Sequence, residues 1–333
     1  MFKFYNKKCN QNEIEEVIHV LNNGWVAPGK KAALLEKEVP LKCNKNHGIL
    51  VNSKNSALFL ACIAYGICEG EQVLIPSVSP QSFIGILSQL KATIKYYDIN
   101  KETLMATPEE IQQYITPETK FVFISNPLSI PQDYSKLANV TIIEDLMYST
   151  VKTTGSDASI ITFDSICALA LFNDPVIYNK ALCIRDWGRV GTQDEDVTKR
   201  YDGWVLGNVR YDFKFVYGNL GFNFKSCEMS SALATIKMNS TSDEINDFDE
   251  LKNQKNLFVS QNGYTLVLSA NEEMRKMLQE KNLIFDTMET FGFAFCGCDE
   301  FANGKEAFEN YVIINNCGNE ENKKIVQTVL GVN

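Results

Sequence analysis

The chain has 333 residues, of which 45% are hydrophobic and 22% are charged, and its formal net charge is −9. This length suits one large domain with a smaller one, and the composition is that of a globular protein with a sizeable core. The negative charge argues against nucleic acid or an anionic membrane as a partner. The N-terminal stretch lacks the apolar region of a signal peptide, and no apolar run could span a bilayer, so we expect a cytoplasmic protein.

The ten cysteines and two histidines do not form a recognisable metal motif. Cys296 and Cys298 stand close together as C-x-C, but no second pair follows at the spacing of zinc ligands. We therefore expect no metal site. Four other cysteines lie in apolar or helical stretches, and we expect them to be buried free thiols: Cys62, Cys68, Cys183 and Cys227.

Helical and strand patterns alternate along the first half of the chain. Residues 12–24 have apolar side chains at helical spacing and end in Asn-Gly, which stops a helix. Further helices are expected at 54–67, where Ser53 or Asn55 can serve as the N-cap, and at 80–92, 107–115 and 131–139. Short apolar runs between them predict strands at 48–53, 71–77, 93–99, 120–126, 140–145, 158–163 and 167–174.

The predicted strands are continuous apolar runs, which is typical of a parallel sheet buried on both faces. Ligands of such sheets bind at the carboxyl ends of the strands. The segments at those ends are VNSKNSA, PSVSPQS, SNPLS, EDLMYS and TFDS.

The pattern changes after residue 190. The segment 191–204 is polar and irregular, a helix is expected over 226–238, and about a hundred residues of mixed α/β character follow. We predict a large α/β domain over residues 1–220, including the N-terminal helix, and a small C-terminal α/β domain over 221–333.

Several of these segments resemble the DegT/DnrJ/EryC1/StrS sugar aminotransferases, and most closely the branch of nucleotide-sugar 3-dehydratases. The resemblance covers residues 10–240 well. It is carried by the strand ends VNSKNSA and IIEDLMYS and, most specifically, by the segments RDWGR, YDFKFVYGNLGFNFK and CEMSSALATIKM. It implies the aspartate-aminotransferase fold (fold type I), with a mainly parallel sheet and helices on both faces, and pyridoxal phosphate or pyridoxamine phosphate as cofactor.

The resemblance also implies roles for individual residues. Asp145 matches the carboxylate that pairs with the pyridine nitrogen of the cofactor and keeps the ring protonated. Ser53, Lys54 and Asn55 match the turn that holds the cofactor phosphate at a helix N-terminus. The matching residues that complete this set are Thr162, where the family has a serine, and Asn223, which matches an asparagine that reaches the phosphate across a dimer interface.

The chain departs from the family where the chemistry takes place. The family places a lysine a few residues after the position of Phe163, to form the Schiff base, or a histidine in the 3-dehydratases. Here the segment is short, it contains neither, and Cys167 is the nearest reactive residue. We expect its thiol to be inert at the edge of a buried strand.

Three further departures point the same way. Lys54 replaces a glycine in the phosphate turn, where it either binds a phosphate or takes the place of that anion. Pro80 stands where an aromatic ring stacks on the cofactor. The cysteines that some 3-dehydrases carry after RDWGR are missing, so no iron–sulfur cluster is expected.

Two other lysines are candidate substitutes for the catalytic one. Lys180 precedes RDWGR on a predicted helix and is expected to face solvent. Lys214 matches a lysine that the 3-dehydratase branch itself carries near its active site, and it is the better substitute.

These observations leave two hypotheses. In the first, the chain is a catalytically degenerate family member that binds a nucleotide sugar and acts as a partner subunit. It would form a homodimer, or a heterodimer with an active paralogue, in deoxysugar or polysaccharide biosynthesis. In the second, it is an active enzyme on a 4-keto-6-deoxy nucleotide sugar that uses pyridoxal or pyridoxamine phosphate with another proton carrier.

Overall fold

A computed structural model describes most of the chain in full-atom detail. The described residues are 9–100, 103–128, 130–147, 150, 152–163, 166–190, 201, 205–240, 257–259, 265–281, 286–287, 301–315 and 320–330. Among them, no helix is both long enough and apolar enough to cross a membrane.

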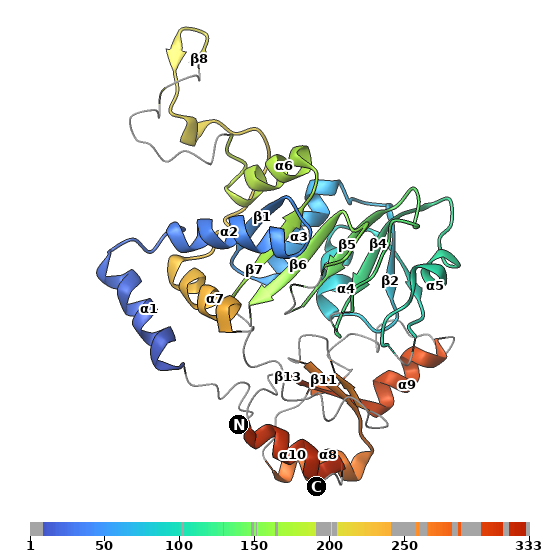
Figure 1. Cartoon of the computed structure of the whole chain (residues 1–333). Helices are drawn as coiled ribbons and strands as arrows, with labels where there is room; N and C mark the ends of the chain where they lie inside the picture. Colours follow the sequence, from blue (N-terminus) through green and yellow to red (C-terminus); the bar gives the residue numbers. More distant parts are fainter. Residues whose placement is uncertain are drawn as a thin grey trace.

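A seven-stranded sheet forms the centre of the molecule, with the strand order β1-β7-β6-β5-β4-β2-β3 (Figure 1). The five strands in the order β6-β5-β4-β2-β3 are parallel to one another. Strand β7 runs antiparallel to both of its neighbours, β1 and β6. The strands are β1 (His47–Val51), β2 (Gln72–Pro76), β3 (Thr93–Tyr97), β4 (Thr119–Ser125), β5 (Thr141–Asp145), β6 (Ala158–Phe163) and β7 (Cys167–Phe172). Each strand predicted for this half of the chain is therefore confirmed, and so is the mainly parallel sheet.

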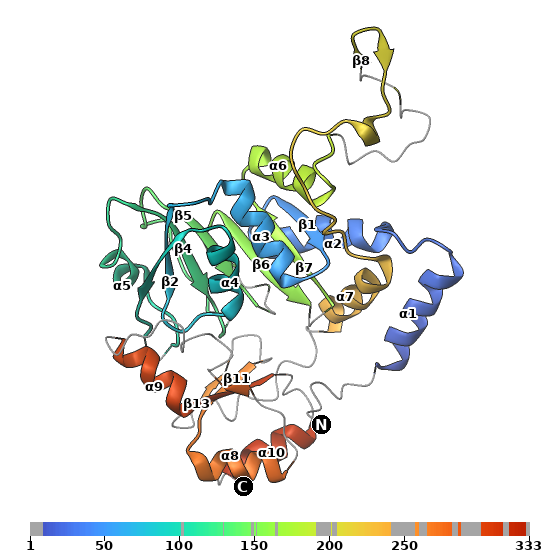
Figure 2. The ribbon, with the colours of Figure 1, turned by 180° about the vertical axis from the view of Figure 1, so that it is seen from behind.

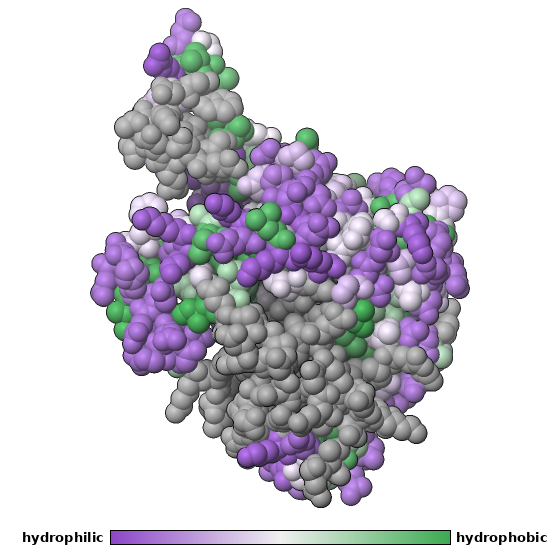
Figure 3. All heavy atoms as spheres, viewed as in Figure 1, coloured by the Kyte–Doolittle hydropathy of each residue, from purple (hydrophilic) through white to green (hydrophobic). Residues whose placement is uncertain are grey.

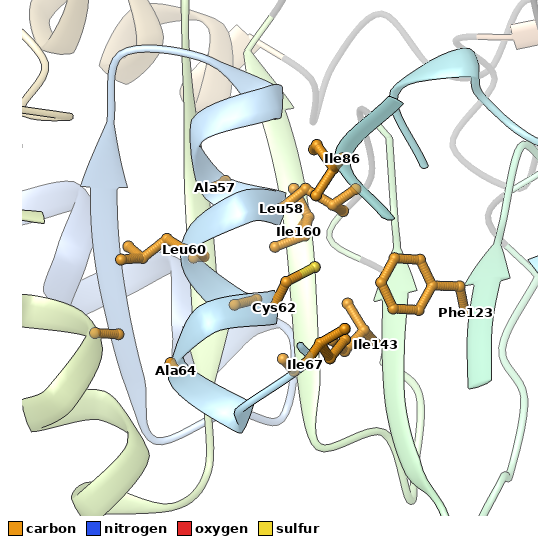
Figure 4. Close-up of a cluster of buried hydrophobic side chains, with 14 of the residues drawn as sticks. Ala57, Leu58, Leu60, Cys62, Ala64, Ile67, Ile86, Phe123, Ile143 and Ile160 are labelled. Atoms are coloured by element: carbon orange, nitrogen blue, oxygen red, sulfur yellow. The ribbon is translucent and has the colours of Figure 1, made fainter. Parts of the chain in front are cut away.

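Helices cover both faces of this sheet. On one face, α3 packs against apolar side chains of the strands, with Leu58 and Cys62 directed toward Phe123, Ile143 and Ile160 (Figure 4). The other face is covered by α2 and α7 over β1, β6 and β7. The helices of this part are α1 (Gln11–Asn22), α2 (Lys30–Lys42), α3 (Lys54–Tyr65), α4 (Gln81–Gln89), α5 (Pro108–Gln112), α6 (Pro175–Arg185) and α7 (Glu228–Ser240).

One helix predicted for this part of the chain is absent from the described residues. A helix was expected at 131–139, but the described residues there form turns and a single bridge between Asp133 and Thr154. The Asp133 carboxylate accepts a hydrogen bond from the N–H of Ser135 at 3.0 Å. Such a side-chain bond to the backbone two residues on competes with helix formation.

The C-terminal part forms a second, antiparallel sheet with its own small core (Figure 2). Leu268, Leu278, Val312 and Val326 are buried there. The elements are β10 (Leu257–Val259), β11 (Thr265–Ser269), β12 (Asp286–Thr287), β13 (Tyr311–Asn315), α8 (Glu272–Glu280), α9 (Ala302–Asn310) and α10 (Glu320–Leu330). The mixed α/β character predicted for this part is confirmed, and the boundary at 220/221 stays a prediction.

An arm projects from the body after α6 (Figures 1 and 2). It carries a two-stranded hairpin of β8 (Val205–Leu206) and β9 (Val209–Arg210), followed by the short helix η2 (Phe213–Phe215). The polar segment 191–204 lies outside the described residues except for Tyr201, which is exposed.

Candidate functional site

The carboxyl ends of β4, β5 and β6 bring polar side chains to one face of the sheet. Ser125 and Asp145 pair in register at the ends of β4 and β5. Thr162 is two residues beyond Ile160, which pairs with Asp145. Because side chains alternate along a strand, Ser125, Asp145 and Thr162 share the face of Phe123, Ile143 and Ile160, which is the face covered by α3.

Asp145 is fully buried, and a tight turn fixes its carboxylate. The N–H of Met147 donates to Asp145 Oδ1 at 3.0 Å. Met147 adopts a left-handed φ of 53°, which is uncommon for a residue with a side chain. The N–H of Thr162 then donates to the Met147 carbonyl at 2.6 Å, which ties the turn to β6. The second carboxylate oxygen, Oδ2, is left for another partner.

Lys54 supplies that partner. It is the first residue of α3, and its Nζ forms an ion pair with Asp145 Oδ2. The Lys54 side chain is 21% exposed and that of Asp145 is 0% exposed. Among the described residues, Oδ2 has no other hydrogen-bond partner. From the sequence, Lys54 was expected either to bind a phosphate or to take the place of that anion. Asp145 could not be identified as its partner, because the two residues are far apart in the chain.

Ser53 is the N-cap of α3, so the structure selects it over Asn55, the other predicted candidate. Its Oγ accepts from the N–H of Ser56 at 3.1 Å and lies 2.8 Å from the Ser56 hydroxyl. Ser56 Oγ in turn donates to Asn52 Oδ1 at 2.6 Å. Asn55 is exposed in the first turn. The N-terminus of α3 is thus close to the site, and its cap is already formed by side chains of the turn itself.

Three buried hydroxyls near the strand ends have no hydrogen-bond partner among the described residues. They are Ser79 after β2, Ser125 at the end of β4 and Thr162 in β6. A buried hydroxyl without a partner costs free energy, so such a group in a native structure binds ordered water, an ion or a ligand. Only Thr162 was singled out in the sequence. Ser79 and Ser125 lie in the strand-end segments PSVSPQS and SNPLS, and this position is the sequence feature that could have identified them.

Cys167 lies on the opposite face of the sheet from Asp145. It pairs with Phe163 across β6 and β7, and both are packed with Leu169 and Leu171 on the face of α2 and α7. Its Sγ donates to the Ser230 carbonyl at 3.9 Å. Burial raises the pKa of the Cys167 thiol to about 12. The structure thus buries the Cys167 thiol among apolar side chains and directs it away from Asp145.

The two lysines considered as substitutes also lie elsewhere. Lys180 in α6 donates from Nζ to the Ala64 carbonyl at 2.9 Å, so it is bound at the C-terminal end of α3, away from Lys54. The expectation that it faces solvent is wrong, because its side chain is partly buried. Lys214 lies in η2 on the projecting arm, where its N–H donates to Asp212 at 3.0 Å.

A third lysine, Lys45, has a lowered pKa but also lies away from Asp145. Burial lowers the pKa of the Lys45 ammonium to about 8. Its Nζ donates to the carbonyl and to the hydroxyl of Ser156, the latter at 2.9 Å, just before β6 begins. This is the amino end of the strands, opposite to Asp145. Lys45 therefore contributes to a buried polar network with Ser156 and Thr153 rather than to the site.

The two most specific sequence motifs pack against one another beside the site. The N–H of Trp187 donates to the Phe222 carbonyl at 2.9 Å, and Asp186 forms a bridge with Asn223. Gly188 and Gly221 permit this contact, since a Cβ on either would collide with the facing backbone. Asn223 is exposed. The carbonyl of the next residue, Phe224, accepts a hydrogen bond from the N–H of Asn52 at 2.8 Å.

The cysteine predictions are only partly confirmed. Cys62 is buried, and Cys183 and Cys227 are partly buried, but Cys68 is exposed because it lies in the loop after α3. Cys296, Cys298 and the stretch after RDWGR lie outside the described residues, except for Val190. Within the described part of the chain, no three His, Cys, Asp or Glu side chains are arranged to hold a metal ion.

The site fits a bound pyridoxal or pyridoxamine phosphate only in part. A buried carboxylate at a strand end, unpartnered hydroxyls and a nearby helix N-terminus suit such a cofactor. However, the Lys54 ammonium is already paired with Asp145 Oδ2, the carboxylate oxygen that the Met147 N–H leaves open. The connection from Phe163 to Cys167 consists of Asp164, Ser165 and Ile166, none of which can form a Schiff base. The residues present therefore do not fit the cofactor in its usual bound form.

Comparison with solved structures confirms the fold. A mutant of GDP-4-keto-6-deoxymannose-3-dehydratase (ColD) with bound GDP-perosamine is similar with a TM-score of 0.80 at 16% identity, over 99% of this chain and 100% of that chain. The E. coli GDP-4-keto-6-deoxy-D-mannose-3-dehydratase with bound hydrated PLP gives a TM-score of 0.76 at 18% identity, over 99% of each chain. The S. venezuelae protein DesV, in complex with a ketimine intermediate, gives 0.74 at 16% identity, over 96% of this chain and 93% of that chain.

The family is shown by the sequence itself. Residues 7–276 match the sequence model of the DegT/DnrJ/EryC1/StrS aminotransferase family, which is most of the chain. The fold, the strand-end carboxylate and the paired glycine-containing motifs agree with this match. The chain thus belongs to the DegT/DnrJ/EryC1/StrS aminotransferase family.

Proposed function

We propose that this chain is a nucleotide-sugar-binding member of its family that does not carry out lysine-based transamination. The observation that carries the proposal is the connection between β6 and β7. It offers no lysine or histidine, and Cys167 at its end faces away from Asp145. Without an amine or imidazole there, neither a Schiff base nor the proton transfer of the family can be supplied from this segment.

The proposed ligand is the nucleotide derivative of a deoxysugar, in deoxysugar or polysaccharide biosynthesis. Support comes from the similar ColD structure, which holds GDP-perosamine. The unpartnered hydroxyls of Ser79, Ser125 and Thr162 can donate to and accept from the hydroxyls of a sugar ring. We further propose that the chain works as a partner subunit, in a homodimer or with an active paralogue.

The projecting arm supports the proposed assembly. Leu220 is 95% exposed, and exposed apolar side chains extend along the hairpin and η2 (Figure 3). They are Val205, Leu206, Val209 and Phe215. Several exposed apolar side chains on one projecting segment favour a protein–protein contact there. Asn223 lies at the base of the arm and is exposed, so it is available to a second subunit.

Calorimetric titration with GDP-perosamine, in the absence of pyridoxal phosphate, tests this function. We expect saturable binding by the purified protein, and no protein-bound absorption band after pyridoxal phosphate has been added and the free compound removed by gel filtration. Asn223→Ala should weaken binding. The control Asn46→Ala, at the amino end of the sheet, should bind as wild type. Binding that requires pyridoxal or pyridoxamine phosphate, together with turnover of a keto-sugar nucleotide, would instead support an active enzyme with another proton carrier.

A further inference from the structure

We propose that Lys54 takes the place of the cofactor's protonated ring nitrogen and closes this site to pyridoxal and pyridoxamine phosphate. The inference deepens the proposed function and rests on it, since it concerns the same site. It goes further by naming the residue that excludes the cofactor and the carboxylate oxygen over which the two compete.

The charge of Asp145 is the first step. Its side chain is 0% exposed, and a carboxylate that is removed from water needs a cation or several hydrogen bonds. The Met147 N–H satisfies Oδ1, and the Lys54 ammonium satisfies Oδ2. In a family member with cofactor, a protonated ring nitrogen supplies the positive charge for this carboxylate. Here the protein supplies that charge from its own chain.

The path of the Lys54 side chain is the second step. Its Cα lies in the first turn of α3, where backbone N–H groups would face a phosphate, and its Nζ lies at the end of β5. A cofactor bound in the family's manner would extend between the same two points, with its phosphate at the helix and its ring nitrogen at Asp145. One side chain therefore connects both ends of the cofactor position, and the two cannot occupy it together.

The pair also differs from the ion pairs on the surface. In the pair of Lys136 with Glu109, the side chains are 71% and 63% exposed, and exposed pairs of this kind contribute little to stability. Asp145 is fully shielded from water, so the loss of Lys54 leaves a buried charge without compensation. This is the physical reason to expect a measurable response to a replacement cation.

The test uses the full chain and three variants: Lys54→Ala, Lys54→Ala/Asp145→Asn and the control Lys136→Ala. Pyridoxamine phosphate is the probe because it carries an amine and needs no lysine to bind. We expect calorimetry to show binding to Lys54→Ala that is at least about tenfold tighter than to wild type. The double variant, which lacks the carboxylate, and Lys136→Ala should both bind as weakly as wild type.

A second measurement covers the case in which Lys54→Ala folds poorly. Ethylammonium chloride should raise the melting temperature of Lys54→Ala, or recover its folded form, more than an equal concentration of sodium chloride does. The double variant should not respond. The inference is overturned if wild type binds pyridoxamine phosphate as tightly as Lys54→Ala, or if the double variant gains the same affinity. Either result leaves the proposed function standing, provided that GDP-perosamine still binds without cofactor and no turnover is seen.

Discussion

Phe163 and Cys167 face each other across the antiparallel pair of β6 and β7, on the side of the sheet opposite to Asp145. Only Asp164, Ser165 and Ile166 join the two strands. A side chain at position 167 therefore points toward α7, while the carboxylate that would hold a cofactor ring lies toward α3. The geometry separates the Cys167 thiol from the Asp145 carboxylate.

Cys167→Lys alone should therefore not create a transaminase. The new ammonium would be directed into an apolar cluster where Cys167 is 1% exposed. Burying it there should lower the free energy of unfolding by about 3 kcal/mol or more. Denaturant unfolding measures this loss, and peptide mass spectrometry after borohydride reduction with pyridoxal phosphate should find no adduct at position 167. A stable variant with a specific adduct there would show that the side chain can reach the cofactor position.

The Cys167 thiol should resist alkylation in the folded protein. Its pKa is raised to about 12 by burial, whereas Cys9 and Cys68 are exposed. At neutral pH, iodoacetamide should label Cys9 and Cys68 first, as resolved by peptide mass spectrometry. Labelling of Cys167 at the same rate would contradict its assignment as an inert thiol.

The same thiol should make stability depend on pH in the alkaline range. Its pKa is raised from 9.0 in the unfolded reference to about 12 in the folded state, so the folded state holds the proton more tightly. The corresponding stability is fully present below about pH 9 and is lost as the pH rises toward 12. The difference in unfolding free energy between wild type and Cys167→Ala should therefore shrink above pH 9, whereas a constant difference would mean that the thiol titrates normally.

Glu228 should be important for the packing of α2 against α7. Its carboxylate accepts from the N–H groups of Gly29 at 2.7 Å and Lys31 at 2.6 Å, and it thereby caps α2, whose N-cap glycine has no side chain. Glu228→Ala should lower the free energy of unfolding by about 2 kcal/mol. The control Glu69→Ala removes an exposed carboxylate that pairs with Lys91, and it should change stability by less than about 0.5 kcal/mol. Equal effects of the two variants would contradict the capping role.

Much of the fold could be predicted from the sequence, because continuous apolar runs specify buried parallel strands without reference to the rest of the chain. Helix α2 was not predicted, since its sequence carries Pro40 near its end and has no side-chain cap of its own. Its cap comes from Glu228, which lies 199 positions after Gly29 in the chain. The Lys54–Asp145 pair was missed for the same reason, because a contact between distant residues leaves no local pattern in the sequence.

The arm should mediate self-association or pairing with a related chain. Light scattering at micromolar concentration should show a dimer for the chain alone if it forms homodimers. Leu220→Glu, which places a charge on a residue that is 95% exposed, should weaken the dimer at least about tenfold. Leu41→Glu serves as a control, since Leu41 is exposed on α2 away from the arm. A dimer that is unaffected by Leu220→Glu would place the contact elsewhere, and a strict monomer would leave only the heterodimer.

The central claim is that this chain forms no covalent bond to pyridoxal phosphate at its site. The most direct measurement treats the wild-type protein with pyridoxal phosphate and borohydride and locates any reduced adduct by peptide mass spectrometry. We expect no specifically labelled lysine and only sparse labelling spread over exposed lysines. A stoichiometric adduct on a single residue, such as Lys54, Lys180 or Lys214, together with turnover of a keto-sugar nucleotide, would contradict it.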